Sequence, residues 1–250
     1  MSTFRLGKHA AVHDPRTFRL KRLLLPRELP TIPQAFDLDK SISTSIPLRM
    51  FLNDKLGCCV IAARAASTLR FEAVETGALV HISDYAVRKQ YLLEGGPSDD
   101  GLVMLDSLNS WRKLGWRLGR HRYRIEAYAS IKPTDHDDLR AAIYLLGGIY
   151  VGLALPSSAA DQLQAGEPWS VVTGAIGTKN SWGGHCVSIF SYSKDWVECI
   201  TWGARQRMTW DFFDRYCDEA YVLVDSLDHW RGTPGIDVAR LRGYLTSIEA

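Results

Sequence analysis

The stretch NDKLGCCVIAA, residues 53–63, places two adjacent cysteines directly before a run of small residues. From Cys59 to Thr76 the chain is rich in alanine and lacks proline, and Gly77 follows, which predicts a helix over 59–76. Cys59 would open this helix, where unpaired N–H groups and the helix dipole favour a thiolate. Cys59 is therefore a candidate nucleophile, with a buried thiol, a disulfide to Cys58 and a metal pair as alternatives.

The composition narrows the class of protein. The chain has 250 residues, enough for one large domain or a domain with extensions, and 46% are hydrophobic and 23% charged. A net charge of +2 gives no reason to expect a nucleic-acid or membrane partner, and no apolar run is long enough to span a membrane. The five cysteines lack zinc-type spacing, and no secretory signal is visible. We expect a reduced, cytoplasmic protein without a metal or cofactor.

Three segments differ in character. Residues 1–47 contain five prolines, and seven Lys or Arg lie between Arg5 and Arg27. This basic arm is expected either to grip a partner or to wrap over the surface. Residues 48–225 form the expected domain, and residues 226–250 form a tail with a helix over 236–248.

The expected domain divides into a helical half and a β-rich half. Helices are predicted over 84–93, 104–114, 135–146 and 209–216, in addition to 59–76. Strands are predicted over 149–155, 186–192, 196–202 and 220–224. Helices dominate the first half and antiparallel strands the second, which indicates an α+β fold in two lobes.

His185 is the best candidate for a general base. It begins a β-run and follows Gly183 and Gly184, which leave room for a substrate. The other histidines lie in the arm, in polar segments or in the tail. A lone cysteine and a lone histidine do not by themselves define a catalytic pair.

The pattern as a whole resembles the papain-like cysteine peptidase superfamily from about Asn53 to Val224. Asn53 lies six residues before Cys59, as a glutamine does before the papain nucleophile, and this register selects Cys59 over Cys58. His185-Cys186-Val187 resembles the His-Ala-Val of the family. Thr201-Trp202-Gly203 stands where the family has Asn-Ser-Trp-Gly, whose asparagine orients the histidine.

The resemblance implies a papain-like two-lobe fold around a central helix and a cysteine peptidase or amidohydrolase acting on a peptide or protein. Cys59 would attack the carbonyl, His185 would act as base and then acid, and Asn53 would help to hold the oxyanion. Ile200 stands at the orienting position, so that Thr201 would have to accept the Nδ1 proton of His185. The substrate-site candidates are Cys58, Trp182, Gly184 and Trp202.

The stretches around Cys59 and Trp202 resemble, more narrowly, papain-fold proteins of bacteriophages and prophages. This likeness implies a host-cytoplasmic or virion-associated protein whose arm could bind phage structural proteins. A catalytically weak or inactive assembly component of a phage particle is the alternative to an enzyme, favoured by Ile200 at the orienting position. The basic residues between Arg112 and Arg124 are expected to form a solvated face rather than a nucleic-acid site.

Overall fold

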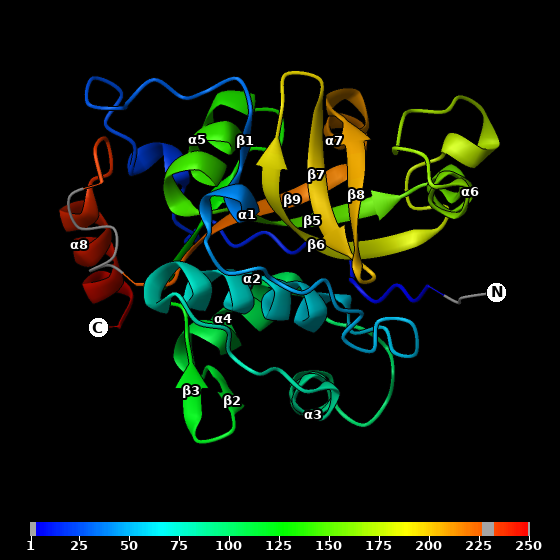
Figure 1. Cartoon of the computed structure of the whole chain (residues 1–250), viewed down its shortest axis with the longest axis horizontal. Coiled ribbons are helices and arrows are strands. Elements are labelled where there is room, and N and C mark those ends of the chain that lie inside the picture. The colour runs from blue at the N-terminus through cyan, green and yellow to red at the C-terminus, as the bar shows by residue number, and fades with distance from the viewer. Residues whose placement is uncertain (1–3, 227–232, 250) are drawn as a thin grey trace.

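A seven-stranded antiparallel sheet forms the centre of the computed structural model, which describes residues 4–226 and 233–249. Its main path runs in the order β4-β9-β5-β6-β7-β8, and the short β1 pairs with β6 (Figure 1). The strands of this sheet are β1 (Phe36–Asp37), β4 (Ala127–Ile131), β5 (Ile149–Leu155), β6 (Gly183–Tyr192), β7 (Trp196–Thr201), β8 (Ala204–Thr209) and β9 (Cys217–Val224).

The strands with strong aliphatic patterns were predictable. All seven residues of β5 are buried, which explains its unbroken apolar sequence. Its predicted bounds are confirmed, whereas β6 begins three residues earlier than predicted and β9 also begins three residues earlier. The prediction missed β4 and β8, whose sequences are less apolar.

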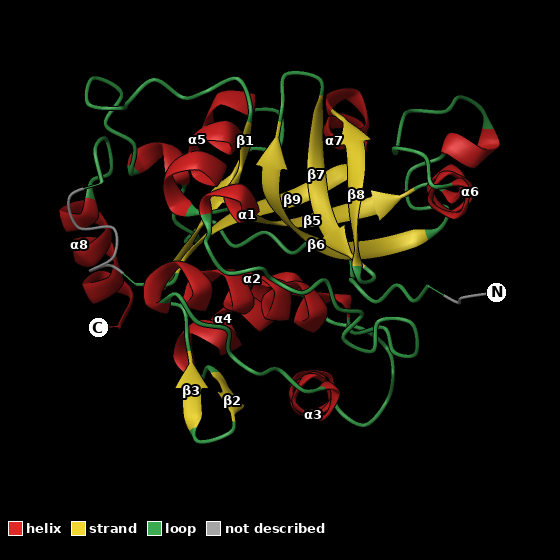
Figure 2. Cartoon of the chain, in the orientation of Figure 1, coloured by secondary structure: helices red, strands yellow, loops and turns green. Residues whose placement is uncertain are grey.

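One lobe of helices covers one face of the sheet (Figure 2). It contains α2 (Cys59–Thr76), α3 (Asp84–Gly95), α4 (Met104–Lys113) and the hairpin of β2 (Trp116–Leu118) and β3 (His121–Tyr123). The predicted bounds of α2 are confirmed: it ends at Gly77, whose φ of 69° is the left-handed cap. It packs on β6, where Ser188 Oγ lies 3.0 Å from Ser67 Oγ and donates to the Ala63 carbonyl at 2.9 Å. The helix is thereby fixed against the strand that carries His185.

The other face of the sheet is covered by helices and by part of the arm. The helical elements outside the first lobe are η1 (Leu20–Arg22), α1 (Leu38–Ser41), α5 (His136–Leu146), α6 (Ser157–Ala165), η2 (Ala175–Gly177), α7 (Trp210–Tyr216) and α8 (Val238–Glu249). Phe18, Leu20 and Leu23 of the arm are buried in the same apolar cluster as Phe212. The arm is therefore built into the core at these positions, because its apolar side chains fill space beneath the sheet.

The tail also packs on the body. The helix predicted over 236–248 is observed as α8, and Leu241 on it is fully buried. Residues 227–232 of the expected tail lie outside the described residues.

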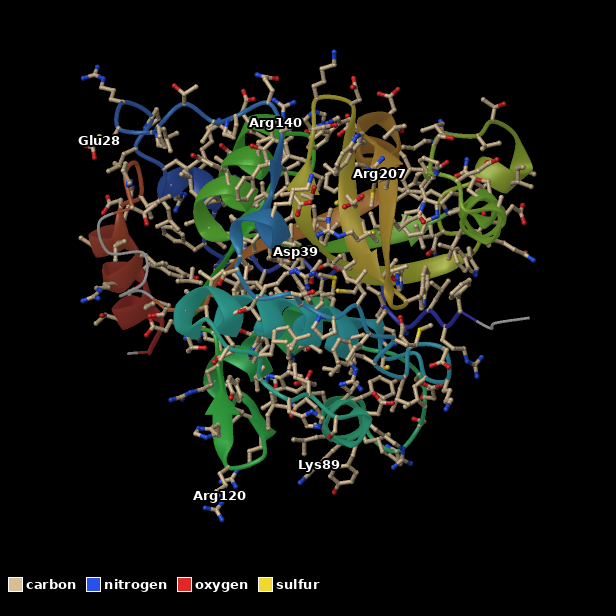
Figure 3. The ribbon with its side chains drawn as sticks, in the orientation of Figure 1. Glu28, Asp39, Lys89, Arg120, Arg140 and Arg207 are labelled. Atoms are coloured by element: carbon tan, nitrogen blue, oxygen red, sulfur yellow. The ribbon has the colours of Figure 1, made fainter. Side chains whose placement is uncertain are left out.

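An ion-pair network connects the two lobes. Asp39 in α1 binds the guanidinium of Arg70 from α2 at 2.7 Å and that of Arg205 from β8 at 2.6 Å. Figure 3 shows Asp39 where α1 meets the boundary between helices and sheet. The Arg70 side chain is 1% exposed, so its charge depends on Asp39 for compensation.

The basic stretch between Arg112 and Arg124 projects outward. Arg120 extends from the tip of the β2–β3 hairpin (Figure 3).

Within residues 4–226 and 233–249, no helix combines the length and the apolar character that crossing a membrane requires.

Candidate active site

Cys59 is the first residue of α2 and is 1% exposed. Cys58 precedes it as the N-cap, is fully buried, and directs its sulfur to the Phe51 carbonyl at 3.4 Å. Both cysteines are free thiols, which rules out the disulfide alternative in this structure. The turn before α2 therefore aims the two neighbouring thiols at different surroundings.

His185 lies on β6, is fully buried and faces Thr201 on β7. Its Nε2 is 2.6 Å from Thr201 Oγ1, and its ring stacks on Trp202 with centroids 4.0 Å apart and planes 9° from parallel. Trp202 has a φ of 44°, a strained conformation for a residue other than glycine. The turn at Trp202 thus brings a flat aromatic face against the imidazole.

Two details of the sequence prediction are corrected here. The nitrogen that contacts Thr201 is Nε2, not Nδ1, and Nδ1 is buried without a hydrogen-bond partner among the described residues. Ile200 is not at the orienting position: it packs in an apolar cluster with Ala66 and Phe190. Side chains alternate along a strand, so Ile200 and Thr201 cannot both face His185, and Thr201 is the residue that does.

Several of these residues border one small cavity of about 10 Å³, the space of about one water molecule. Its lining includes Cys59 from α2, Thr201 and Trp202 from the end of β7, Asn53 from the turn and Cys186 from β6. His185 lies next to Cys186 and contacts two of the lining residues. The fold therefore gathers the sequence-predicted residues from three separate parts of the chain at one point.

The remaining substrate-site candidates lie around this point. The Trp182 ring is 5.5 Å from the Trp202 ring, and Gly184 directly precedes His185 on β6. Asn53 is 2% exposed, and its Nδ2 donates to the carbonyls of Leu56 and Arg5, each at 3.1 Å. The amide predicted to hold an oxyanion is thus bonded to a carbonyl of the N-terminal arm.

Residues 5–9 of the arm run through the candidate site. The N–H groups of Gly7 and Lys8 donate to the Gly184 carbonyl at 3.3 and 3.1 Å. On the other side, the Leu102 N–H donates to the Gly7 carbonyl at 2.7 Å, and the His9 N–H donates to the Leu102 carbonyl at 2.9 Å. The arm is thereby bonded to both lobes, and it runs between α2 and the sheet (Figure 1).

Close backbone approach at Gly7 makes this path possible. A Cβ at Gly7 would overlap the Gly57 carbonyl, one at Gly101 would overlap the Gly7 carbonyl, and one at Gly184 would overlap the Lys8 carbonyl. These glycines are therefore needed for the arm to fit. This role is not predictable from local sequence patterns, because the contacts join residues about 50 to 180 positions apart.

Burial by the arm and the core keeps the pair uncharged. Burial raises the pKa of the Cys59 thiol to about 11, even though backbone hydrogen bonds, including one from Gly7, act to lower it. Burial also lowers the pKa of His185 to about 3. At neutral pH the covered site thus contains a thiol and a neutral imidazole.

The arrangement of potential metal ligands and of the remaining cysteines bears on the metal alternative. No three His, Cys, Asp or Glu side chains group as metal ligands within the part of the chain that the structure describes. Cys186, Cys199 and Cys217 are buried, as predicted for core residues.

Comparison with known proteins identifies solved structures with a similar fold. No family model matches the sequence, and no curated protein sequence matches it. The structure is similar to xylellain, a cysteine protease from Xylella fastidiosa, with a TM-score of 0.70 and 16% identity over 90% of this chain and 98% of that chain. It is also similar to a Carica candamarcensis cysteine protease, with a TM-score of 0.56 and 15% identity over 78% and 100% of the chains. A third similar structure is procathepsin B of Trypanosoma congolense, with a TM-score of 0.61 and 12% identity over 89% and 87%.

Proposed function

The chain has the papain-like two-lobe α+β fold, and from this premise we propose that it is a cysteine peptidase or amidohydrolase. The proposal rests on one observation above all. Cys59 at the start of α2 and Thr201, which contacts His185, border one cavity, and an extended peptide segment lies bonded over it. A site that already accommodates a peptide backbone beside a thiol and an imidazole is suited to peptide hydrolysis.

Once the arm has left the groove, each residue of the site has its own role in the reaction. His185 Nδ1, which has no hydrogen-bond partner within residues 4–226 and 233–249, takes the proton of Cys59, while Thr201 holds Nε2. The thiolate attacks the amide carbonyl, and the oxyanion is held by the Cys59 N–H and by Asn53 Nδ2, which the Arg5 carbonyl no longer occupies. His185 then protonates the leaving amine, and water hydrolyses the thioester.

The arm blocks the site through its backbone hydrogen bonds. The Gly7 N–H donates to the Gly184 carbonyl at 3.3 Å, and the Gly7 carbonyl accepts from the Leu102 N–H at 2.7 Å. The backbone of the arm is thus held by both lobes, and the arm covers the site as a blocking segment.

Turnover by a full-length chain with a displaced arm tests the proposal. Gly7→Val displaces the arm because its side chain would overlap the Gly57 carbonyl. We expect this chain to hydrolyse a fluorogenic peptide amide, and Cys59→Ser in the same background to abolish hydrolysis. Cys217→Ser, which changes another buried cysteine, is the matched control and should retain it. Equal hydrolysis by the Cys59→Ser and Cys217→Ser chains would refute a catalytic role for Cys59.

A phage or prophage assembly component is the second candidate function. It is favoured by the uncharged, covered pair, with the pKa of Cys59 raised and that of His185 lowered. Under this reading the arm would be released to bind phage structural proteins rather than to admit a substrate. A chain that binds particles through residues 1–47, with Cys59→Ser harmless to that binding and no peptide hydrolysis after Gly7→Val, would support the assembly role.

A further inference from the structure

The β2–β3 hairpin lies in a segment of strong positive charge. Residues 112–124 contain six Lys or Arg and no Asp or Glu, although the whole chain has a net charge of only +2. Among the residues that the structure describes, no carboxylate lies within ion-pair distance of five of these six: Lys113, Arg117, Arg120, Arg122 and Arg124. Ion pairs within the chain therefore leave the charge of the hairpin uncompensated.

The register of the hairpin sets like charges against each other. Arg117 and Arg122 are directly opposite in the antiparallel pair, on its exposed face, and Arg120 lies in the two-residue tip. A Cβ at Gly115 would overlap Arg124 Cγ and would lie 3.2 Å from Arg122 Cγ, so these two side chains pass over the same glycine. Like charges directly opposite destabilise a strand pair. The arrangement is thus unfavourable until an anionic surface lies against it.

Helix α3 presents apolar and basic side chains at the same end of the molecule. Tyr85, Lys89 and Leu93 are spaced four residues apart, which places them on one side of the helix, and Val87 on the opposite side is buried. Tyr85 is 71% and Leu93 is 72% exposed, the two highest values among the large hydrophobic residues that the structure describes. α3 packs against β2, and Lys89 and Arg120 both project from the lower edge of the molecule (Figure 3).

The apolar side chains decide which anionic surface fits. A third one, Leu114, is 60% exposed at the foot of the hairpin, where Arg122 Nη1 donates to the Leu114 carbonyl at 3.1 Å. A polynucleotide offers phosphates to the arginines, but its backbone offers no apolar medium to an aliphatic side chain such as Leu93. A bilayer with anionic lipid offers both, because phosphate headgroups lie directly above the acyl boundary.

We infer that the outer face of α3 and the β2–β3 hairpin form a docking face for a bilayer that contains anionic lipid. The docking face comprises Tyr85, Lys89, Leu93, Arg117, Arg120 and Arg122. Its basic side chains bind headgroup phosphates, and its apolar side chains enter the headgroup boundary. The face lies on the side of the lobe of helices away from the sheet, whereas the candidate site lies between α2 and the sheet (Figure 2). Docking therefore leaves the candidate site clear of the bilayer and does not depend on the peptidase function.

Flotation of the full-length chain with lipid vesicles tests the docking face. At low salt, we expect the parent to float with phosphatidylcholine vesicles that contain about 30% phosphatidylserine, and not with vesicles of phosphatidylcholine alone. Binding should be lost at about 1 M salt, which screens charges beyond about 3 Å. The hairpin variant, Arg117→Gln/Arg120→Gln/Arg122→Gln, should bind about 100-fold more weakly, because each basic residue near an anionic surface contributes about fivefold.

Two matched variants separate position from total charge and from total hydrophobicity. The control variant, Lys132→Gln/Lys179→Gln/Lys194→Gln, removes the same charge from exposed sites outside the lobe of helices and should bind like the parent. Leu93→Ser should weaken binding several-fold, whereas Ile176→Ser, at another exposed apolar residue, should not.

Three results would overturn the inference. The first is equal binding by the hairpin and control variants, and the second is absence of flotation of the parent with either vesicle. The third is binding of a labelled DNA or RNA oligonucleotide by a parent that leaves the vesicles unbound, which would assign the arginines to nucleic acid.

A urea titration shows whether the hairpin variant is folded. Its midpoint should equal or exceed that of the parent, because the substitutions remove a pair of like charges. A lower midpoint would show that the arginines stabilise the free protein, and would overturn the argument that they await an anionic surface.

Discussion

Displacing the arm should greatly increase the rate at which an alkylating reagent modifies Cys59. Gly7→Val places a branched side chain where even a Cβ overlaps the Gly57 carbonyl, so residues 5–9 cannot keep their hydrogen bonds to Gly184 and Leu102. Most of the domain is untouched, because the fully packed apolar anchors of the arm begin at Phe18, whereas Phe4 and Leu6 near the substitution are only partly buried. The variant therefore tests the covering segment and not the fold.

The expected magnitude follows from ionisation of the thiol. With a pKa of about 11, roughly one Cys59 in 10⁴ is a thiolate at pH 7. An exposed cysteine of ordinary pKa is about 3% ionised, a gain of roughly 300-fold, and pairing with His185 would extend the gain towards 10⁴-fold.

The assay is the rate of iodoacetamide modification at pH 7, read at Cys59 by peptide mass spectrometry. Cys217, which is buried in the core, is the internal reference. Ala10→Val is the matched control because Ala10 is an exposed residue of the same arm. A variant in which trypsin newly cuts after Lys8, showing that the arm is free, while Cys59 reacts no faster than in the parent would refute the reasoning.

Three further predictions concern the groups around the site and the lobe contact. Burial lowers the His185 pKa to about 3, so between pH 6.5 and 3 the unfolded chain binds a proton that the folded chain does not, and stability falls as pH falls. In urea titrations, the free energy of unfolding of the parent should fall by about 3 kcal/mol more between pH 7 and pH 4.5 than that of the His185→Asn variant. An equal fall in both proteins would contradict the buried neutral imidazole. In the Gly7→Val background, Thr201→Val should lower kcat by about 10- to 100-fold because Nε2 loses its partner, while Thr201→Ser should retain most activity; equal effects would argue against the hydroxyl. Asp39→Asn should destabilise the chain by about 3 kcal/mol or more, since it leaves the Arg70 charge buried without compensation, and Asp161→Asn should have almost no effect in the same urea titration.

The predictable parts of the fold are those with strong local patterns. The alanine-rich sequence and Gly77 define α2 to the residue, and the apolar run of β5 defines a fully buried strand. By contrast, β8 contains three consecutive polar residues, Arg205, Gln206 and Arg207, and is held by pairing with β7. Its strand character comes from a partner distant from any local signal.

The sequence proposes the members of the candidate site, whereas the covering of the site by the arm is seen only in the structure. The six-residue step from Asn53 selected Cys59, and the glycines before His185 selected the base. The choice between Ile200 and Thr201 required the strand register, and the arm in the groove required contacts such as that of Gly7 with Gly184. Tertiary contacts of this kind leave no trace in local sequence.

The arm is covalently attached to the domain, and this attachment lowers the affinity that the arm needs in order to keep the site covered. Only about ten residues separate Lys8 from the buried anchor Phe18, so the blocking segment is held near the groove at an effective concentration of about millimolar. A segment whose intrinsic dissociation constant is as weak as about 10 μM would then leave the site open only about 1% of the time, at any protein concentration. Cutting the chain between residues 10 and 17 would remove this advantage and make closure depend on dilution, so the exposed link between groove and anchor is the place where control of the site is concentrated.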